Sequence, residues 1–498
     1  MSRIVVIGSG FSGLSAAAYL SREGHQVWVF EKNGSPGGRA RQFSTEEGYV
    51  FDMGPSWYWM PEVFENFFRD FGHTVADFYE LLLLDPAFEV VFDKEEYISI
   101  TQNYEELRRL FESRESGSAI RLDEFMEEAK FKYSTGMDKM VHMPGLSISE
   151  FADVDLLKGV MRLQVFSSFS SHVRKFFKDP RLIALMEFPV LFLGAMPRET
   201  PALYSLMNYA GLKLGTWYAR GGFGKVVEGM LQVCKENGCT IHLNAAVEEI
   251  LVDGEKVTGV VVNGKEIACD AVIAAADYQH VEEKLLPTEL RNYPESYWKK
   301  KTFAPSCLIF YLGLNRKLPK LKHHTLFFEE DFLQHSIDIY KQPRWPKKPL
   351  FYVCCPSRTD RSVAPQGHEN LFLLMPLAPG IEDTEKLREE YYDLMMTRIE
   401  KRLGRPIREN VVYKHGYCIK DFIEDYNSYK GNAYGLANTL RQTAIFKPRI
   451  RNRKVKNLFY AGQLTVPGPG VPPALMSGKI AATELMNFLK TSKYEKAI

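Results

Sequence analysis

The chain has 498 residues, of which 45% are hydrophobic and 25% charged, proportions typical of a globular protein with large apolar cores. The formal net charge of +1, without a polybasic tail, gives no reason to expect a nucleic-acid partner. Seven cysteines are scattered, apart from Cys354-Cys355, which is typical of free thiols in a reducing cytosol. We therefore predict a cytoplasmic protein, built from two or three packed units at this length.

The first apolar segment is too short and too rich in glycine to be a signal peptide. No stretch of about 18 uncharged apolar residues occurs, so we expect no helix that spans a membrane.

The first forty residues predict a strand, a glycine turn, a helix and a second strand. Residues 3–7 form a continuous apolar run, as in a strand buried on both faces of a parallel sheet. A helix is expected over 14–22 and a strand over 26–30. The turn between the first strand and the helix has the GxGxxG spacing, and it consists of Gly8, Ser9, Gly10, Phe11, Ser12 and Gly13.

Each of these residue types fits a dinucleotide site. Gly8 permits the tight turn, Gly10 lets the backbone approach a pyrophosphate, and Gly13 lets helix and strand pack closely. The helix N-terminus offers amide donors to the phosphates. Glu31, followed by Lys32, ends the second strand at close to the usual spacing of about 20 residues for the acid that binds a ribose hydroxyl. A carboxylate there repels a 2′-phosphate, which favours NAD or FAD over NADP.

Two further turns favour FAD over NAD. Gly37 and Gly38 suit a second pass of backbone beside the diphosphate, and Arg39 supplies a fixed cation near the phosphates or the flavin. The turn at 52–55 contains Gly54 and Pro55, and the glycine allows backbone to lie close to a flat ring.

The chain then leaves the nucleotide-binding unit. Short strand-like pieces between 85 and 97 mark the change, and residues 103–143 have helical spacing. Segments 156–163 and 171–178 combine apolar and basic residues, and 183–193 is almost wholly apolar apart from one glutamate. These segments fit either amphipathic helices at a membrane interface or internal helices of a second domain with charges on its surface. We expect residues 201–207 to line or approach an apolar pocket.

Residues 218–225 return the chain to the first unit, followed by a helix over 226–237. Three short strands between 247 and 269 form a meander with Asp-Gly and Asn-Gly turns, and a buried strand follows over 271–276. In flavoproteins with such an inserted meander, the backbone at a position like Val247 holds the adenine.

The middle of the chain carries few chemical signals. We predict strands over 306–314 and 371–376 and a helix over 385–403. The histidines at 323, 324, 335, 368 and 415 are not spaced as metal ligands, so we expect surface or hydrogen-bonded roles and no metal site. No nucleophile elbow occurs in the chain.

The C-terminal region restores the nucleotide signal. A strand is predicted over 457–461 and a helix over 474–489, joined by a turn with Gly462, Gln463, Gly470 and Val471. Such a turn aims backbone donors at a flavin phosphate and ring carbonyl. Gln463 stands where many flavoproteins have an acid for the ribityl chain, and it is a neutral hydrogen-bonding substitute.

The segments 5–40, 52–55 and 460–478 resemble the bacterial-type phytoene desaturases, carotenoid desaturases of the FAD-dependent amine oxidase-like superfamily. The resemblance extends through 191–194, 201–209 and 215–222, and the Gly468-to-Pro472 ending is the most particular to carotenoid desaturases. It implies an α/β fold in which a Rossmann-like FAD-binding domain of the two-dinucleotide-fold type carries an inserted α+β substrate domain and a helical membrane-facing region. We expect residues 1–80, 218–285 and 446–498 to form the FAD domain, and 81–217 with 286–445 to form the substrate-binding and membrane-associating region.

The resemblance also implies a reaction. A C40 polyene loses hydride to flavin N5 and a proton from the neighbouring carbon, and oxygen or a quinone reoxidises the flavin. The enzyme is expected at the membrane surface. The reaction mainly requires orientation in a dry tunnel, so we name no catalytic residue, although Arg39 or Asp52 could lie near the ring.

Three other functions remain open: a desaturase of another carotenoid, a carotenoid isomerase or saturase, and a flavin amine oxidase. A non-catalytic carotenoid- or membrane-binding protein is the fourth, and it would show no flavin absorbance.

Overall fold

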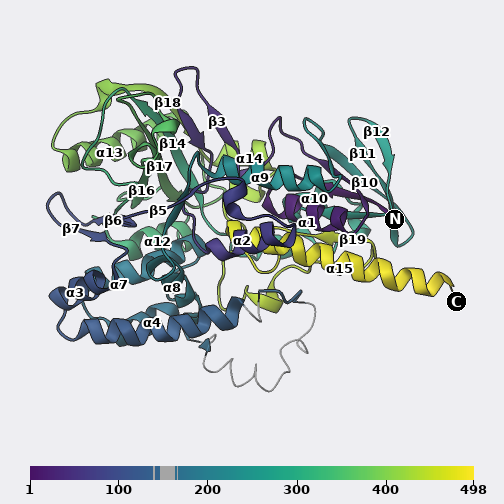
Figure 1. Cartoon of the computed structure of the whole chain (residues 1–498), viewed down its shortest axis with the longest axis horizontal. Coiled ribbons are helices and arrows are strands. Elements are labelled where there is room, and N and C mark those ends of the chain that lie inside the picture. Colours follow the sequence, from purple (N-terminus) through teal and green to yellow (C-terminus); the bar gives the residue numbers. More distant parts are fainter. Residues whose placement is uncertain (138–140, 146–162, 165–166, 498) are drawn as a thin grey trace.

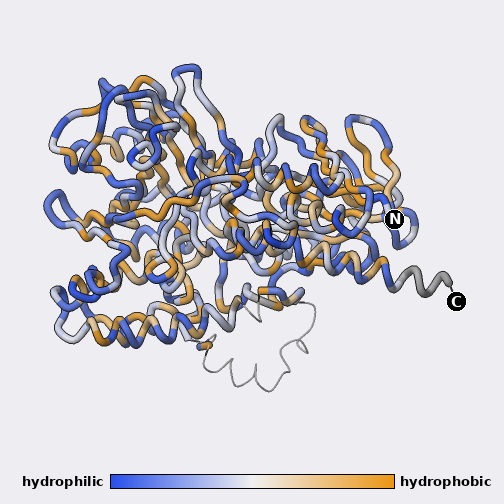
Figure 2. Tube along the Cα trace, viewed as in Figure 1, coloured by the Kyte–Doolittle hydropathy of each residue, from blue (hydrophilic) through white to orange (hydrophobic). Residues whose placement is uncertain are grey.

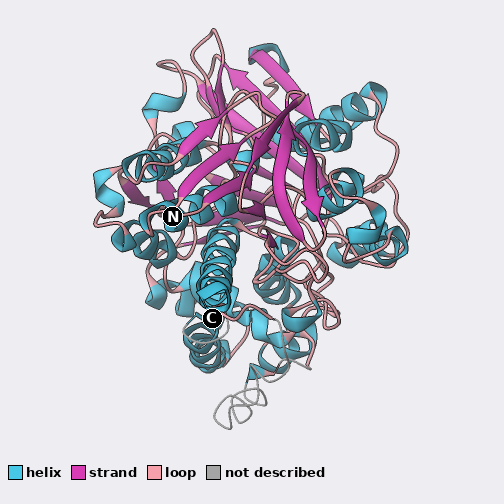
Figure 3. Cartoon of the chain, turned by 90° about the vertical axis from the view of Figure 1, so that its right-hand side faces the viewer, coloured by secondary structure: helices cyan, strands magenta, loops and turns pink. Residues whose placement is uncertain are grey.

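A computed structural model describes residues 1–137, 141–145, 163–164 and 167–497, and it contains two large sheets packed with helices (Figure 1). Figure 3 shows the strands gathered in the upper centre of the molecule, with helices on both sides and below.

The first sheet is parallel throughout, as the sequence predicts. Its strand order is β19-β13-β1-β2-β9, and the strands are β1 (Arg3–Ile7), β2 (Gln26–Phe30), β9 (Thr240–His242), β13 (Ala271–Ala274) and β19 (Leu458–Tyr460). Helices α1 (Phe11–Arg22), α9 (Phe223–Glu236) and α15 (Val471–Ala497) pack together, α1 against both of the others.

The strand β1 is buried on both faces because its side chains alternate between two cores. Ile4 and Val6 belong to the core that contains α1, whereas Val5 and Ile7 belong to a core shared with the meander. The meander is the predicted antiparallel sheet of β10 (Val247–Asp253), β11 (Lys256–Val262) and β12 (Lys265–Ala268).

Three helices begin one turn earlier than the sequence predicts. They start at Phe11, Phe223 and Val471, where we expected 14, 226 and 474. The apolar spacing that reveals a helix begins only where its side chains enter the core, and the first turn of α1 and of α15 instead faces a cavity. Prolines at 472 and 473 are tolerated because a helix makes no intrahelical N–H bond in its first turn.

The second sheet is mixed, with order β18-β14-β17-β16-β15-β6-β7, and among these strands β15 and β6 alone pair in parallel. Its strands are β6 (Phe88–Val91), β7 (Tyr97–Ile100), β14 (Ser306–Leu314), β15 (His324–Phe327), β16 (Phe351–Cys354), β17 (Glu369–Leu377) and β18 (Val411–Tyr417). Helix α13 (Glu385–Leu403) covers one face through Met395 and Ile399, and the other face turns toward the nucleotide-binding unit.

A helical layer lies below the second sheet in Figure 1. It comprises α3 (Tyr104–Arg114), α4 (Ser118–Thr135), α6 (Phe169–Phe176), α7 (Pro180–Glu187), the 3-10 segment Phe188–Leu193 and α8 (Leu206–Leu212). Segment 171–178 falls largely on α6, where Phe169 and Val173 are buried and Arg174 pairs with Glu187 of α7. Residues 156–162 lie outside the described residues.

Hydrophilic and hydrophobic residues alternate along α4 in Figure 2. Among the described residues, no helix combines the length and apolarity needed to cross a bilayer.

The remaining elements are short and connect these layers. They are β3 (Gln42–Ser44), β4 (Val50–Asp52), α2 (Pro61–Asp70), β5 (Leu81–Leu83), β8 (Trp217–Ala219), α10 (Tyr278–Lys284), α11 (Glu295–Lys299), α12 (Phe332–Tyr340) and α14 (Ile419–Tyr426).

Candidate functional site

One cavity of about 520 Å³ reaches from the carboxyl ends of β1 and β2 to the inner face of the second sheet. All the predicted cofactor-binding residues except Ser9 and Gly13 line it: Gly8, Gly10, Phe11, Ser12, Glu31, Lys32, Gly37, Gly38, Arg39, Gly54, Pro55, Val247, Gly462, Gln463, Gly470 and Val471. The fold therefore gathers segments from both ends of the sequence at one site.

The first two glycine turns meet backbone to backbone. Gly37 N donates to Ser9 O at 2.9 Å, and Gly10 pairs with Gly37 as a parallel bridge. A Cβ atom on Gly38 would lie only 3.1 Å from the Gly10 Cα atom. The main chain is thus exposed to the cavity at the point where the N-terminus of α1 begins, and no side chain of the described residues caps that helix. Free amides and the helix dipole suit an anionic diphosphate.

Gly13 lies outside the cavity and has a packing role. A Cβ atom there would lie 1.9 Å from Gly8 O, so only glycine lets α1 cross the turn this closely.

Ser9 also lies behind the cavity wall, and it positions Glu31. The Glu31 Oε2 atom accepts hydrogen bonds from Ser9 N at 2.9 Å and Ser9 Oγ at 2.8 Å. The other oxygen accepts from Asn33 N at 2.9 Å and Asn33 Nδ2 at 3.1 Å. The buried carboxylate is fixed at the end of β2, and Ser9 Oγ and Asn33 Nδ2 are the partners that can rotate away for ribose hydroxyls.

Several buried polar atoms on the cavity wall have no hydrogen-bond partner among the described residues. They are Arg39 Nε, Asn438 Oδ1 and Gln463 Nε2. An unpaired buried polar atom costs about 1–3 kcal/mol, so three such atoms in residues that line one cavity suit a polar ligand there. The diphosphate, ribityl and ring carbonyl groups of a flavin nucleotide supply such partners.

Apart from its unpaired Nε atom, the Arg39 guanidinium is held in place by contacts with other residues. Its Nη2 atom donates to Ser428 Oγ at 3.2 Å and Asn432 O at 3.3 Å, and its guanidinium lies 4.9 Å from the Tyr426 ring centroid. Burial lowers the pKa of Arg39, and the nearby Asp277 carboxylate opposes this shift. Arg39 therefore supplies a fixed positive charge and cannot act as a base.

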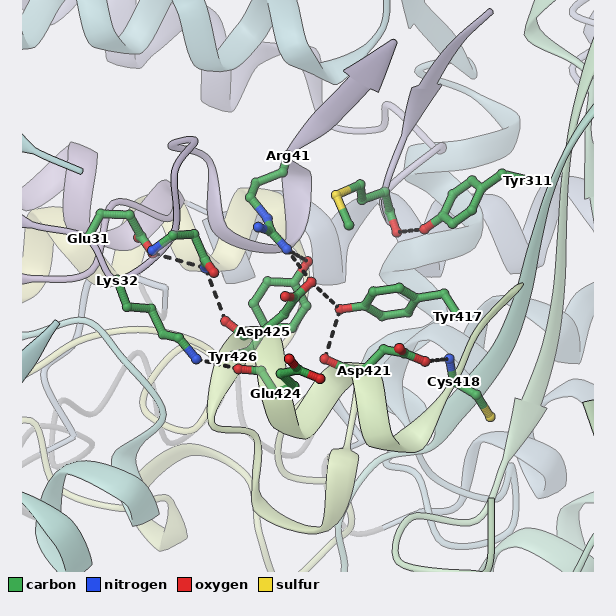
Figure 4. Close-up of polar contacts among 12 residues, drawn as sticks. Glu31, Lys32, Arg41, Tyr311, Tyr417, Cys418, Asp421, Glu424, Asp425 and Tyr426 are labelled. Atoms are coloured by element: carbon green, nitrogen blue, oxygen red, sulfur yellow. Dashed lines mark hydrogen bonds and ion pairs between the residues drawn. The ribbon is translucent and has the colours of Figure 1, made fainter. Parts of the chain in front are cut away.

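Helix α14 closes the nucleotide end of the cavity (Figure 4). Lys32 Nζ donates to Glu424 O, and Asn33 Nδ2 donates to Asp425 O at 3.0 Å. The Asp425 carboxylate pairs with Arg41 and accepts from Tyr417 OH at 2.8 Å. No sequence signal identified α14, because its partners lie almost four hundred positions away.

Asp52 does not line this cavity, so the structure gives no support to a role as proton acceptor at the ring. Its carboxylate accepts from Phe223 N at 2.8 Å, Gly224 N at 3.3 Å and Gln42 Nε2 at 2.8 Å, and thereby fixes the start of α9. Burial raises the pKa of Asp52 to about 6.

The far end of the cavity is apolar. Leu203, Tyr204, Leu206 and Met207 line it, which confirms that segment 201–207 reaches a pocket. Large side chains from separate parts of the chain complete the wall, among them Trp57, Phe188, Leu326, Phe328, Phe351 and Leu374.

His335 lies on this wall as a neutral ring. Its Nδ1 atom accepts from Leu350 N at 3.0 Å, so Nε2 donates to Pro376 O at 3.0 Å. Burial lowers the pKa of His335 to about 4. With both nitrogens engaged, His335 shapes the wall and is not a free acid or base.

This arrangement defines a class of protein. Glycine turns at a helix N-terminus, at the carboxyl edge of a parallel sheet with an acid on the second strand, form a dinucleotide site, and the cavity beyond it is large enough for a second reactant. The protein is an FAD-dependent oxidoreductase.

Comparison with known proteins identifies the family. Residues 11–486 match the model of the flavin-containing amine oxidoreductases, and the chain belongs to this family. It is 40% identical over 484 residues to a carotenoid 3,4-desaturase of Haloarcula japonica, covering 97% of this chain and 98% of that protein.

Two further relatives are similar over nearly their whole length. A zeta-carotene-forming phytoene desaturase of Myxococcus xanthus is 33% identical over 98% of this chain and 94% of that protein. A 4,4'-diapophytoene desaturase of Staphylococcus haemolyticus is 30% identical over 98% of this chain and 100% of that protein. The resemblance to bacterial-type carotenoid desaturases is thus confirmed.

Solved structures share the fold at low identity. The cyclohexylamine oxidase of Brevibacterium oxydans IH-35A superposes with a TM-score of 0.60 at 14% identity, over 98% of this chain and 99% of that one.

Proposed function

We propose that this protein is a carotenoid desaturase that uses FAD to introduce double bonds into a C40 polyene. Its first substrate is phytoene, which it converts towards lycopene. The observation that carries the proposal is the single cavity that joins a polar nucleotide end to an apolar end lined by aromatic and aliphatic side chains. The names of the three relatives agree with this substrate class.

The cofactor, when bound, supplies a hydride acceptor for a saturated carbon beside the polyene. The chain holds it through the residues predicted from the sequence. Backbone at Gly8, Gly10, Gly37 and Gly38 would hold the diphosphate, and Glu31 would bind the ribose. The Gln463 side chain, whose Nε2 atom is unpaired, would donate a hydrogen bond to the ribityl chain or the ring.

The apolar wall orients the polyene and excludes water. Trp57 and Phe188 are wedged against each other, with ring centroids 6.0 Å apart, and Leu206 and Met207 lie on the α8 side. Large aromatic and aliphatic side chains dominate this wall, so the polyene is positioned by shape and contact.

The nucleotide end and the apolar end of the cavity belong to different parts of the chain. All strands of the first sheet come from residues 1–80, 218–285 and 446–498, and all strands of the second from 81–217 and 286–445. We propose these segments as the FAD domain and the substrate domain. Because the substrate partitions into lipid, we also propose that the protein works at a membrane surface, with oxygen or a quinone as electron acceptor.

Desaturation at the 3,4 position of a carotenoid is the second candidate. It is favoured by the higher identity to the Haloarcula japonica protein than to the other two relatives.

Turnover in liposomes tests these proposals. The FAD-loaded protein is incubated with phytoene or with lycopene, and the products are separated by chromatography. We expect phytoene to yield longer chromophores. Conversion of lycopene alone supports the second candidate, geometric isomers alone indicate an isomerase, and oxidation of amines without carotenoid turnover would overturn both.

A further inference from the structure

Three potential metal ligands meet where β15 begins and the neighbouring strand β16 ends. His324, the first residue of β15, pairs in the antiparallel ladder with Cys354, the last residue of β16, so their side chains share one face. His323 immediately precedes the strand. One ligand atom from each of the three residues lies within 4.8 Å of the others, and all three residues are buried.

Both imidazoles are oriented by a hydroxyl group at Nδ1, and one of these hydroxyls, Tyr352 OH, also bonds the Cys354 thiol. His323 Nδ1 bonds Thr359 Oγ1 at 2.8 Å, and His324 Nδ1 bonds Tyr352 OH at 2.6 Å. The Tyr352 hydroxyl in turn contacts Ser56 Oγ at 3.0 Å. A hydrogen bond that fixes one ring nitrogen and leaves the other free is the usual support of a metal-binding histidine.

The other nitrogen of each ring has no hydrogen-bond partner within the described part of the chain. His323 Nε2 and His324 Nε2 are both buried, in residues that are 4% and 0% exposed. Two unpaired ring nitrogens are costly in a core, at about 1–3 kcal/mol each, unless a ligand binds them.

The space and the charge also suit a cation. A small cavity of about 20 Å³ is lined by His323, Cys354 and Asp52, with Tyr218 on its wall, and His324 lies beside it without lining it. This volume holds a single ion or water molecule. A divalent cation there would balance the Cys354 thiolate formed on binding and the nearby Asp52 carboxylate, whose own bonds to α9 leave it in an outer position.

We propose that His323, His324 and Cys354 bind one Zn²⁺ ion, with a water molecule in the small cavity completing four ligands. Two imidazoles and a thiolate are ligands that zinc prefers. The ion would link β15 to β16. Because the Trp57 ring stacks on His324, with centroids 4.1 Å apart, the ion would also stabilise the apolar wall of the main cavity. Sequence spacing predicted no metal site because Cys354 reaches the histidines only through strand pairing.

The test measures metal in the purified, FAD-loaded protein after removal of any affinity tag. Grown with added zinc, the wild type should contain about one Zn²⁺ per chain by mass spectrometry, and Cys354→Ser should lose most of it. Cys355→Ser is the matched control. Its thiol belongs to the opposite core, contacts Ser357 Oγ at 3.6 Å, and should leave the zinc content unchanged.

A second measurement covers variants that fail to fold. Cobalt-loaded wild type should show a thiolate-to-cobalt charge-transfer band, and the cobalt-loaded Cys355→Ser protein should retain it. Wild-type protein that binds neither zinc nor cobalt would show that the site holds water only and would overturn the proposal. So would a Cys354→Ser variant with wild-type zinc content. Both readouts are independent of carotenoid turnover.

Discussion

The two ends of the main cavity are built in different ways. At the nucleotide end the wall is main chain, held close by glycines at 8, 10, 37 and 38 and by the N-terminus of α1. At the apolar end the wall is made of large side chains carried by β14–β17, α8 and α12. Backbone suits a ligand that never changes, whereas side chains can be exchanged to fit a different substrate. Substitutions at the two ends should therefore fail in different ways.

The largest effect is expected at Gly13. Gly13→Val places a side chain where even a Cβ atom would lie 1.9 Å from Gly8 O, so α1 must separate from β1. We expect a loss of more than about 3 kcal/mol in the free energy of unfolding, measured by urea denaturation. Gly10→Ala is the control, because its Cβ atom would meet only Gly38 Cα at 3.9 Å. A Gly13→Val protein of normal stability would show that the crossing of α1 over the turn is wrong.

Gly10→Val should separate folding from cofactor binding. The protein leaves room for a side chain at this position, but that side chain would occupy the path of the diphosphate. We expect a folded protein whose flavin affinity falls by at least about tenfold, or 1.4 kcal/mol. Flavin absorbance after gel filtration measures this, with circular dichroism to verify the fold. Normal flavin content would contradict the placement of the turn.

A charge at the apolar end should impair carotenoid turnover without affecting flavin binding. Met207→Asp puts a carboxylate on the wall of the cavity, where a polyene cannot solvate it. We expect kcat/KM for carotenoid turnover to fall by at least about tenfold while flavin content stays normal. Met207→Leu should remain close to wild type. Loss of flavin in the Asp variant would mean that the two ends are not independent.

The most gradual effect concerns pH, and it is absent at neutral pH. The pKa of His335 is about 4 in the folded protein against 6.5 for an ordinary histidine, so the unfolded chain binds the extra proton. His335 therefore costs no stability above pH 6.5 and destabilises the fold progressively as pH falls toward 4, by about 2–3 kcal/mol at the end of that range. His335→Gln, which cannot take up a proton, should flatten the dependence of Tm on pH between 6.5 and 4. An unchanged slope would show that other groups control acid unfolding.

Sequence patterns locate those parts of the molecule that are specified locally. β1, β2, β14 and α13 have the predicted bounds, because a continuous apolar run or a strong helical period ends at a clear boundary. The glycine turns were identifiable because a strand, glycines at fixed offsets, a helix and an acid follow one another in the order that a dinucleotide site requires. Helix starts were misplaced by one turn where the first residues face the cavity rather than the core.

Other features depend on contacts that no local pattern encodes. The α14 contacts join residues 32–41 to 417–425, and the histidine–cysteine cluster forms only when β15 pairs with β16. Asp52 has the residue type of a catalytic acid, yet its partners are the first amides of α9. Distinguishing these roles requires knowing which distant backbone lies nearby.

The crossing of α15 over α1 has a consequence for how the protein is made. A Cβ atom on Gly478 would lie 2.2 Å from Ser12 O, and β19 forms an edge of the sheet that β1 begins. Domains generally fold from the N-terminus as the ribosome releases them. In this protein, β1 stays unpaired on one side until β13 has been synthesised. The flavin pocket stays incomplete until residue 478 has been translated. With the cofactor held as proposed, we expect its uptake to come late in biosynthesis, and nascent chains shorter than this should carry no flavin.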